Sequence, residues 1–163
     1  MNDKKTRKEK DSMGNLEVPL NALYGANTQR AILNFPISDL KLSNSLINSI
    51  TQIKSFAAKV NAKLGILDNA TATLIENACK EIMEGKHYDQ FVVDVFQTGS
   101  GTSTNMNVNE VISNIAIKSI DGKIGSRDPV HPNDHVNKGQ SSNDVIPSAI
   151  HIASSMGIKN NLI

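Results

Sequence analysis

Apolar side chains recur at helical spacing over two long stretches in the middle of the chain. From Ser43 onward they follow one another at steps of three and four, and Gly65 then supplies a stop; the positions are Leu46, Ile50, Ile53, Ala57, Val60 and Leu64. A second stretch begins near Asp68 as N-cap and ends at Gly85, with Leu74, Ile75, Ala78, Ile82 and Met83 on one side. The pattern predicts two long helices that pack antiparallel.

Two further helices are predicted downstream, and each is entered through a polar loop. The first runs from about Asn105 to Ile120 and follows the polar approach in FQTGSGTSTNMNVNE, residues 96–110. The second starts at about Asn143, after HPNDHVNKGQSSND, residues 131–144, and tolerates Pro147 in its first turn. The segment YDQFVVDVFQ, residues 88–97, is too short and too mixed in period to assign.

The N-terminal part of the chain shows no long periodic pattern. Residues 13–38 are punctuated by glycines and prolines, with only short extended pieces such as Leu16–Val18 between them, which predicts a wrapping arm. Residues 1–12 are polar and of mixed charge, and we expect them to form a frayed tail.

Composition supports a single, mainly α domain. The chain has 163 residues, of which 39% are apolar and only 4% aromatic, with no tryptophan. The core must therefore be built from Leu, Ile, Val and Ala, which favours helices over an aromatic-rich β-sandwich.

Charge and cysteine content exclude several classes of protein. Residues 1–10 carry five basic and two acidic side chains, so the net charge of +1 leaves the remainder at about −2, which disfavours a nucleic-acid partner. No run approaches the roughly 18 apolar residues of a membrane-spanning helix, and the basic start lacks the apolar core of a secretory signal. The single Cys79 rules out an internal disulfide framework, so a cytoplasmic setting is expected.

The two polar loops are the candidate functional sites. A helix N-terminus leaves backbone N–H groups unpaired and carries positive partial charge, so glycines and small hydroxyl residues before it can hold a carboxylate or phosphate. Gly99 and Gly101 would let the backbone approach such an anion closely. The alternative is that Thr102 or Thr104, and Ser141 or Ser142, simply cap their helices. The spacing of a phosphate-binding P-loop is absent.

Three long segments resemble the fumarase/aspartase superfamily, and most closely its class II fumarate hydratases. They are DSMGNLEVPLNALYGANTQRAILNFPIS in the arm, FQTGSGTSTNMNVNEVISN at the first loop and VHPNDHVNKGQSSNDVIPSAIHIA at the second. The resemblance implies an N-terminal fumarase-like domain over 13–140, and over 141–163 the start of a truncated central helical bundle.

The resemblance also implies roles for individual residues. Ser100 and Thr102, with the backbone of Gly101 between them, would bind a carboxylate of fumarate or L-malate. The second loop would bind the substrate through Ser141, Ser142 and Asn143. A second, non-catalytic dicarboxylate site would comprise His131, Pro132, Asn133 and Asp134.

The implied reaction is the reversible hydration of fumarate to L-malate, without a metal or organic cofactor. The sequence agrees in having no clustered His/Cys ligand spacing. The family's general-base serine loop, with the pattern Gly-Ser-Ser-x-Met-Pro-x-Lys-x-Asn, and its catalytic histidine do not occur in this sequence. His151 is predicted to lie on a helix face. No residue of this chain is therefore assigned a catalytic role, and the chain alone is predicted to be inactive.

Three functional interpretations remain open. The first is the N-terminal fragment of a fumarate hydratase, whose relatives assemble as homotetramers with active sites built from three subunits. The second is a non-catalytic remnant that binds a dicarboxylate or a homologous subunit. The third is aspartate ammonia-lyase, for which a Gly-Ala pair in place of Gly99-Ser100 and a Ser-Thr-Asn in place of residues 141–143 would be expected, although Ser103 favours this interpretation.

Overall fold

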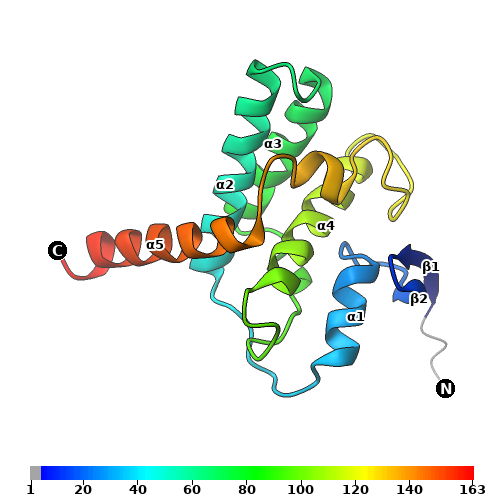
Figure 1. Cartoon of the computed structure of the whole chain (residues 1–163), viewed down its shortest axis with the longest axis horizontal. Helices are drawn as coiled ribbons and strands as arrows, with labels where there is room; N and C mark the ends of the chain where they lie inside the picture. Colours follow the sequence, from blue (N-terminus) through cyan, green and yellow to red (C-terminus); the bar gives the residue numbers. More distant parts are fainter. Residues whose placement is uncertain (1–4) are drawn as a thin grey trace.

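The computed structural model describes residues 5–163 and is mainly helical, as the composition predicts. One two-stranded antiparallel sheet lies near the N-terminus, and helices form the rest of the regular structure (Figure 1). The elements in chain order are β1 (Thr6–Asp11), β2 (Gly14–Pro19), α1 (Ala26–Asn34), α2 (Asn44–Lys63), α3 (Asn69–Met83), the short 3₁₀ turn η1 (Tyr88–Gln90), α4 (Thr102–Lys118), the π-helical turn η2 (Pro132–Val136) and α5 (Ser142–Asn161).

The two long helices predicted from the apolar spacing are confirmed as α2 and α3. The predicted cap Asp68 is confirmed, since its carboxylate accepts from the N–H of Thr71 at 2.8 Å. Ser43, where the first apolar pattern begins, caps α2: its hydroxyl accepts from the N–H of Leu46 at 3.3 Å. The chain reverses over residues 64–68, so that α3 packs back along α2 (Figure 1).

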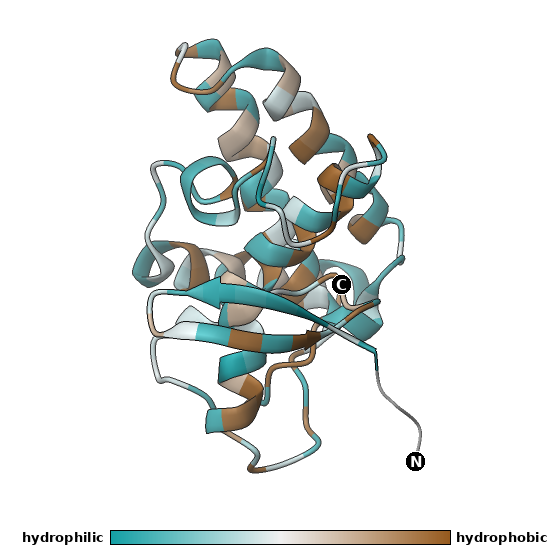
Figure 2. Cartoon of the chain, turned by 90° about the vertical axis from the view of Figure 1, so that its right-hand side faces the viewer, coloured by the Kyte–Doolittle hydropathy of each residue, from teal (hydrophilic) through white to brown (hydrophobic). Residues whose placement is uncertain are grey.

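Helix α4 runs through the centre of the molecule. Every residue from 107 to 117 is buried, and its apolar side chains join those of α2 and α3 in one core. In Figure 2 the apolar stretches lie mainly on the helices, whereas β1 is hydrophilic along its length. The helix begins at Thr102, three residues before the predicted start, because the side chain of Gln97 accepts from the N–H of Thr104 at 2.9 Å and holds the first turn.

Polar side chains on the buried faces of α4 bind the backbone of the irregular segments. The amide of Asn107 donates to the carbonyl of Gln90 at 3.0 Å. Asn114 donates to the carbonyl of Leu23 and accepts from the N–H of Gly125, both at 2.8 Å. These bonds satisfy loop backbone groups that have no partner within a helix or sheet.

The carboxylate of Glu110 caps a helix that the sequence analysis did not predict. Glu110 is 2% exposed and accepts five hydrogen bonds of 2.6 to 3.1 Å from the start of α1: the N–H of Gly25, the N–H and side-chain amide of Asn27, and the N–H and hydroxyl of Thr28. The prediction of an irregular arm over residues 13–38 is therefore wrong at α1. Its cap comes from a residue more than eighty positions away, so no local signal marks its start.

The N-terminal segment is also more ordered than predicted. The extended piece at Leu16–Val18 lies within β2, but the frayed tail expected over residues 1–12 is wrong for β1, which pairs along its whole length with β2; residues 1–4 lie outside the described part of the chain. The guanidinium of Arg7 pairs with Glu9 at 2.7 Å and donates to loop carbonyls, including that of Tyr24 at 2.7 Å. The charges that suggested a solvated tail instead fix the hairpin to the loop before α1.

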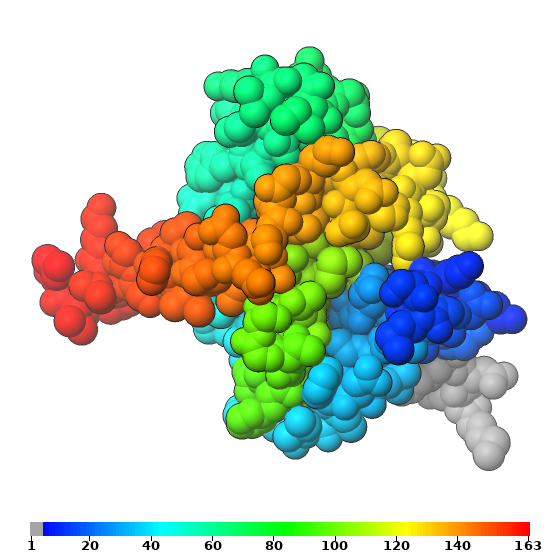
Figure 3. Space-filling view, in the orientation of Figure 1, coloured from blue at the N-terminus to red at the C-terminus, as the bar shows by residue number. Residues whose placement is uncertain are grey.

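Helix α5 extends away from the body of the molecule (Figures 1 and 3). It starts one residue before the predicted position and buries only Val145 and Ala149 fully. Three of its large apolar side chains, Ile150, Met156 and Ile158, are 47 to 50% exposed, and that of Leu162 at its end is 82% exposed. The helix therefore has an incompletely covered apolar face.

The capping role of Glu110 can be tested with Glu110→Gln. An amide in place of one carboxylate oxygen faces at least two N–H or O–H donors, and each buried donor that loses its acceptor costs roughly 1–3 kcal/mol. We expect a fall in the free energy of unfolding of that size or more in urea titrations. Glu76→Gln, in which no hydrogen bond of the described structure is removed, is the matched control; equal stability of the two variants would contradict the role of Glu110.

Candidate functional site

Three hydroxyl groups meet where α4 and α5 begin. The Oγ of Ser100 and the Oγ1 of Thr102 share a hydrogen bond at 2.8 Å, and the same Oγ1 lies 3.0 Å from the Oγ of Ser142. Thr102 and Ser142 are the first residues of their helices, so the positive ends of both helices adjoin the group. We call Ser100, Thr102 and Ser142 the hydroxyl cluster; it joins the two polar loops singled out in the sequence.

Gly101 allows the first loop to pass close to the second. Its φ of +68° lies in the left-handed region, and a Cβ at this position would stand 3.0 Å from Cγ1 of Ile146 in α5. Both its conformation and its surroundings therefore favour glycine. Gly99 has open space around it, so nothing in the fold itself requires a glycine there.

The capping alternative describes some of the candidate residues and not others. Ser141 is an N-cap, since its Oγ accepts from the N–H of Asn143 at 3.3 Å. Thr104 is buried, and its hydroxyl bonds to the side chain of Gln97. Thr102 caps nothing: its hydroxyl bonds only to the other two members of the hydroxyl cluster. Asn143 is exposed, and in residues 5–163 its side chain makes no hydrogen bond.

The residues expected to form a second dicarboxylate site lie together around η2. The Nδ1 of His131 accepts from the N–H groups of Asn133 and Asp134 at 3.2 and 3.1 Å, so the ring caps this turn, of which Pro132 is the first residue. Burial lowers the pKa of His131, although Asp134 opposes the shift. Asn133 and Asp134 are exposed. Within residues 5–163 no hydrogen bond joins this group to the hydroxyl cluster, so the two candidate sites are separate.

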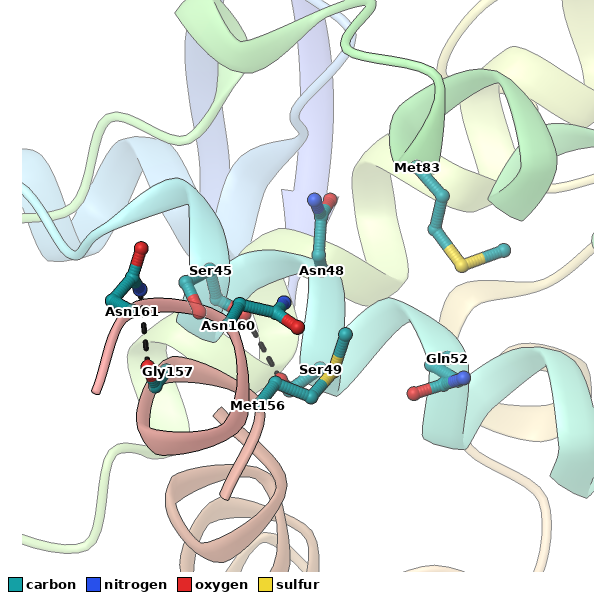
Figure 4. Close-up of a pocket in the computed structure, with 9 residues that line it drawn as sticks. All are labelled: Ser45, Asn48, Ser49, Gln52, Met83, Met156, Gly157, Asn160 and Asn161. Carbon is teal, nitrogen blue, oxygen red and sulfur yellow. Dashed lines mark hydrogen bonds between the residues drawn. The ribbon is translucent and has the colours of Figure 1, made fainter. Parts of the chain in front are cut away.

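A different pocket, of about 360 Å³, lies between the start of α2 and the end of α5 (Figure 4). Amide and methionine side chains contribute to its wall: Asn48, Gln52, Asn160, Asn161, Met83 and Met156. None of the candidate site residues lines it. It is therefore not the site predicted from the two polar loops.

A buried lysine behind the hydroxyl cluster was missed by the sequence analysis. Lys54 in α2 is fully buried, and its Nζ donates to the Oδ1 of Asn137 at 2.7 Å. Burial lowers the pKa of this amine to about 7. It lies beside Ile53 of the apolar pattern, and in the sequence it is indistinguishable from the exposed Lys59 of the same helix.

Residues 5–163 offer neither a metal-ligand cluster nor a membrane-spanning helix. They contain no group of three or more His, Cys, Asp or Glu side chains placed to hold a metal ion. Within the same range, no helix has the length and hydropathy needed to cross a membrane.

Comparison with known families and sequences gives one consistent result. Residues 14–163 match the family model described as Lyase. A class II fumarate hydratase from a strain of Prochlorococcus marinus is 56% identical over 157 residues, which is 96% of this chain and 34% of that protein. A class II fumarate hydratase from Wigglesworthia glossinidia brevipalpis is 53% identical over the same length and proportions. The chain spans about a third of the length of these relatives.

Solved structures agree with the sequence comparison. The native form of a fumarate lyase:delta crystallin from Brucella melitensis superposes with a TM-score of 0.92 at 42% identity, covering 95% of this chain and 36% of that one. A recombinant class II fumarase from Schistosoma mansoni gives 0.91 at 44% identity, covering 94% and 33%. The fold described above is therefore that of the matching third of these proteins.

The depressed pKa of Lys54 predicts a specific pH dependence of stability. Between pH 7 and its ordinary pKa of 10.5, the unfolded chain holds a proton on Lys54 that the folded chain lacks. Stability therefore rises with pH across this window, by up to about 1.4 kcal/mol per pH unit from this group. We expect the wild-type chain to gain stability relative to Lys54→Met between pH 7 and 10. The measurement is urea unfolding at several pH values.

Lys59→Met, at an exposed position of the same helix, is the matched control for removal of a lysine side chain. A constant difference between wild type and Lys54→Met over the whole range would contradict the assigned protonation.

Proposed function

This chain belongs to the lyase family, and we propose that it is the N-terminal third of a class II fumarate hydratase, in which it supplies one wall of the dicarboxylate site. The reaction proposed for the whole enzyme is the reversible hydration of fumarate to L-malate. The proposal rests on the similarity to class II fumarate hydratases together with one structural observation, the hydroxyl cluster at the adjoining starts of two helices.

The hydroxyl cluster suits a carboxylate for two reasons. Each hydroxyl can rotate to donate to an anion, and in the absence of one the three groups satisfy each other, as the 2.8 and 3.0 Å distances show. The first-turn N–H groups of α4 and α5 add positive partial charge without a cationic side chain. Ser100, Thr102 and Ser142 would thus bind one carboxylate, with Gly101 contributing its backbone and Asn143, the next residue of α5, an unengaged side-chain amide.

Neutral donors also suit the charge change of the proposed reaction. Removal of a proton from the carbon next to a carboxylate forms an aci-carboxylate, in which additional negative charge develops on the carboxylate oxygens. Donors already directed at those oxygens stabilise this state more than the ground state. An acid then assists the departure of hydroxide, which yields fumarate, and the reverse sequence hydrates fumarate.

The proton-transferring groups would come from outside this chain. Its sequence contains neither the serine loop nor the histidine that the family resemblance implies, so the 163-residue chain alone should not turn over. The incompletely covered apolar face of α5 would pack against the remaining helices of a homotetramer. The His131–Asp134 group would form the second, non-catalytic dicarboxylate site, and a cytoplasmic location remains a prediction.

The proposal predicts complementation between two separate parts of the enzyme. The 163-residue chain should be inactive alone, and it should hydrate fumarate after it is mixed with the C-terminal portion of a homologous class II fumarate hydratase. The loss of fumarate absorbance measures the reaction, and size-exclusion chromatography establishes that the two parts associate. An associated but inactive mixture would favour the non-catalytic remnant, and ammonia release from aspartate by the same mixture would favour the ammonia-lyase.

The role of the hydroxyl cluster is tested most simply with Thr102→Val. Valine keeps the shape of the threonine side chain and removes the donor, and one such donor to developing charge is typically worth about 10²–10³ in kcat, or ~2.7–4 kcal/mol. We expect a loss of this size in the complemented mixture. Thr73→Val, at an exposed position of α3, is the matched control. Equal rates for the two variants would refute the assignment of Thr102.

A further inference from the structure

The side chain of Asn137 joins three parts of the molecule beneath the hydroxyl cluster. Its Oδ1 accepts from the Nζ of Lys54 in α2 at 2.7 Å and from the Nδ2 of Asn105 in α4 at 3.2 Å. Its Nδ2 donates to the carbonyl of Gln140 at 3.1 Å. Lys54 and Asn105 are both buried. One amide therefore ties two helices to the segment that leads into α5.

Two of the bonded residues lie close along the chain to members of the hydroxyl cluster. Asn105 follows Thr102 by three residues, one turn along α4, and Gln140 precedes Ser142 by two residues. Thr102 and Ser142 themselves meet through a single exposed hydrogen bond of 3.0 Å. Because an exposed hydroxyl pair competes with water, it cannot hold the two helix ends in place by itself.

We propose that Lys54 is a positioning residue for the dicarboxylate site: through Asn137 it holds the segment 137–141 against α4, so that the hydroxyls of Thr102 and Ser142 stay together. The inference rests on the function proposed for the hydroxyl cluster and assigns a role to a residue remote from it. Lys54 does not touch the hydroxyl cluster; its Nζ acts on Asn137, and Asn137 acts on the loop.

The burial of Lys54 strengthens its hydrogen bond to Asn137 and explains why a lysine occupies this position. Removing an amine from water is costly unless it is hydrogen-bonded, so the position of Nζ fixes the position of its acceptor. The amine donates a hydrogen bond in both its charged and its neutral form, so the lowered pKa does not break the link. The other bond from α2 to this loop, from Asn61 to the carbonyl of Lys138 at 3.0 Å, is exposed to solvent.

Two further buried groups show that this region depends on polar contacts. The Oδ1 of Asn105 and the Oε1 of Gln140 are buried, and neither has a hydrogen-bond partner anywhere in residues 5–163. Some polar groups of this region therefore already lack a hydrogen-bond partner. If the bond between Lys54 and Asn137 were lost, no spare donor would be at hand to replace the amine.

The first test uses the 163-residue chain alone and needs no activity. In Lys54→Met, amide hydrogen exchange measured by NMR should become about tenfold faster or more at residues 140–145 and 102–106, and unchanged in α1. Lys59→Met controls for the loss of a lysine, and Asn61→Ala controls for the loss of the exposed bond to the same loop. Both variants should exchange at the wild-type rates. Unchanged rates in Lys54→Met, or equally raised rates in α1, would overturn the proposal.

A second variant keeps the test decisive if Lys54→Met does not fold. Asn137→Ala removes the same bond from its half-buried partner and should accelerate exchange over the same residues. If Lys54 acts through Asn137, the double variant should exchange no faster than Asn137→Ala alone. Additive effects of the two substitutions would refute the proposed route through Asn137.

The complemented mixture supplies the functional readout. Misplacement of Thr102 and Ser142 should lower kcat per assembled complex in Lys54→Met, with the amount of complex measured by size-exclusion chromatography, whereas a chain that is only less stable gives fewer complexes of unchanged kcat. An unchanged kcat per complex would refute a positioning role. If the wild-type mixture does not hydrate fumarate, the proposed function fails, while the exchange rates of the chain alone still decide the role of Lys54.

Discussion

The carboxylate of Glu110 is the contact on which the position of α1 against α4 depends. It is buried on α4 and accepts five hydrogen bonds from the first turn of α1, so that one side chain satisfies the backbone donors of a helix end far away in sequence. Other polar residues of the same helix bond to the loops, donating to the carbonyls of Leu23 and Gln90 and accepting from the N–H of Gly125. A helix buried along its central turns therefore serves both as the hydrophobic core and as the anchor for the irregular backbone around it.

The candidate site continues the same arrangement at the start of α4. Below the surface, the bonds among Lys54, Asn105 and Asn137 join two helices to a loop, and above them the hydroxyls of Thr102 and Ser142 are left open to solvent. Recognition of a changing charge requires hydroxyl donors that are held in place by the residues packed beneath them. Such donors need not reorganise when the charge develops. The proposed function and the proposed role of Lys54 both follow from this geometry.

Local sequence signals predicted the parts of the fold whose determinants are local. The spacing of apolar residues from Ser43 onward, and Asp68 as a cap, correctly located α2 and α3. Helix α1 was missed because the Glu110 carboxylate that caps it is distant in sequence. Strand β1 was missed because Arg7 bonds to loop carbonyls, such as that of Tyr24, outside its own segment. For the site, the two polar loops could be identified from their hydroxyls and glycines. The meeting of Thr102 with Ser142, and the burial of Lys54, depend on how helices pack and leave no trace in a single sequence.

We propose that this chain binds a carboxylate of the substrate at the adjoining starts of α4 and α5. The most direct measurement is a crystal structure of the complemented complex with L-malate bound. A malate carboxylate within hydrogen-bonding distance of the hydroxyls of Thr102 and Ser142, with their mutual bond replaced, is the predicted result. Malate bound elsewhere, with the 3.0 Å bond between these two hydroxyls intact, would contradict it.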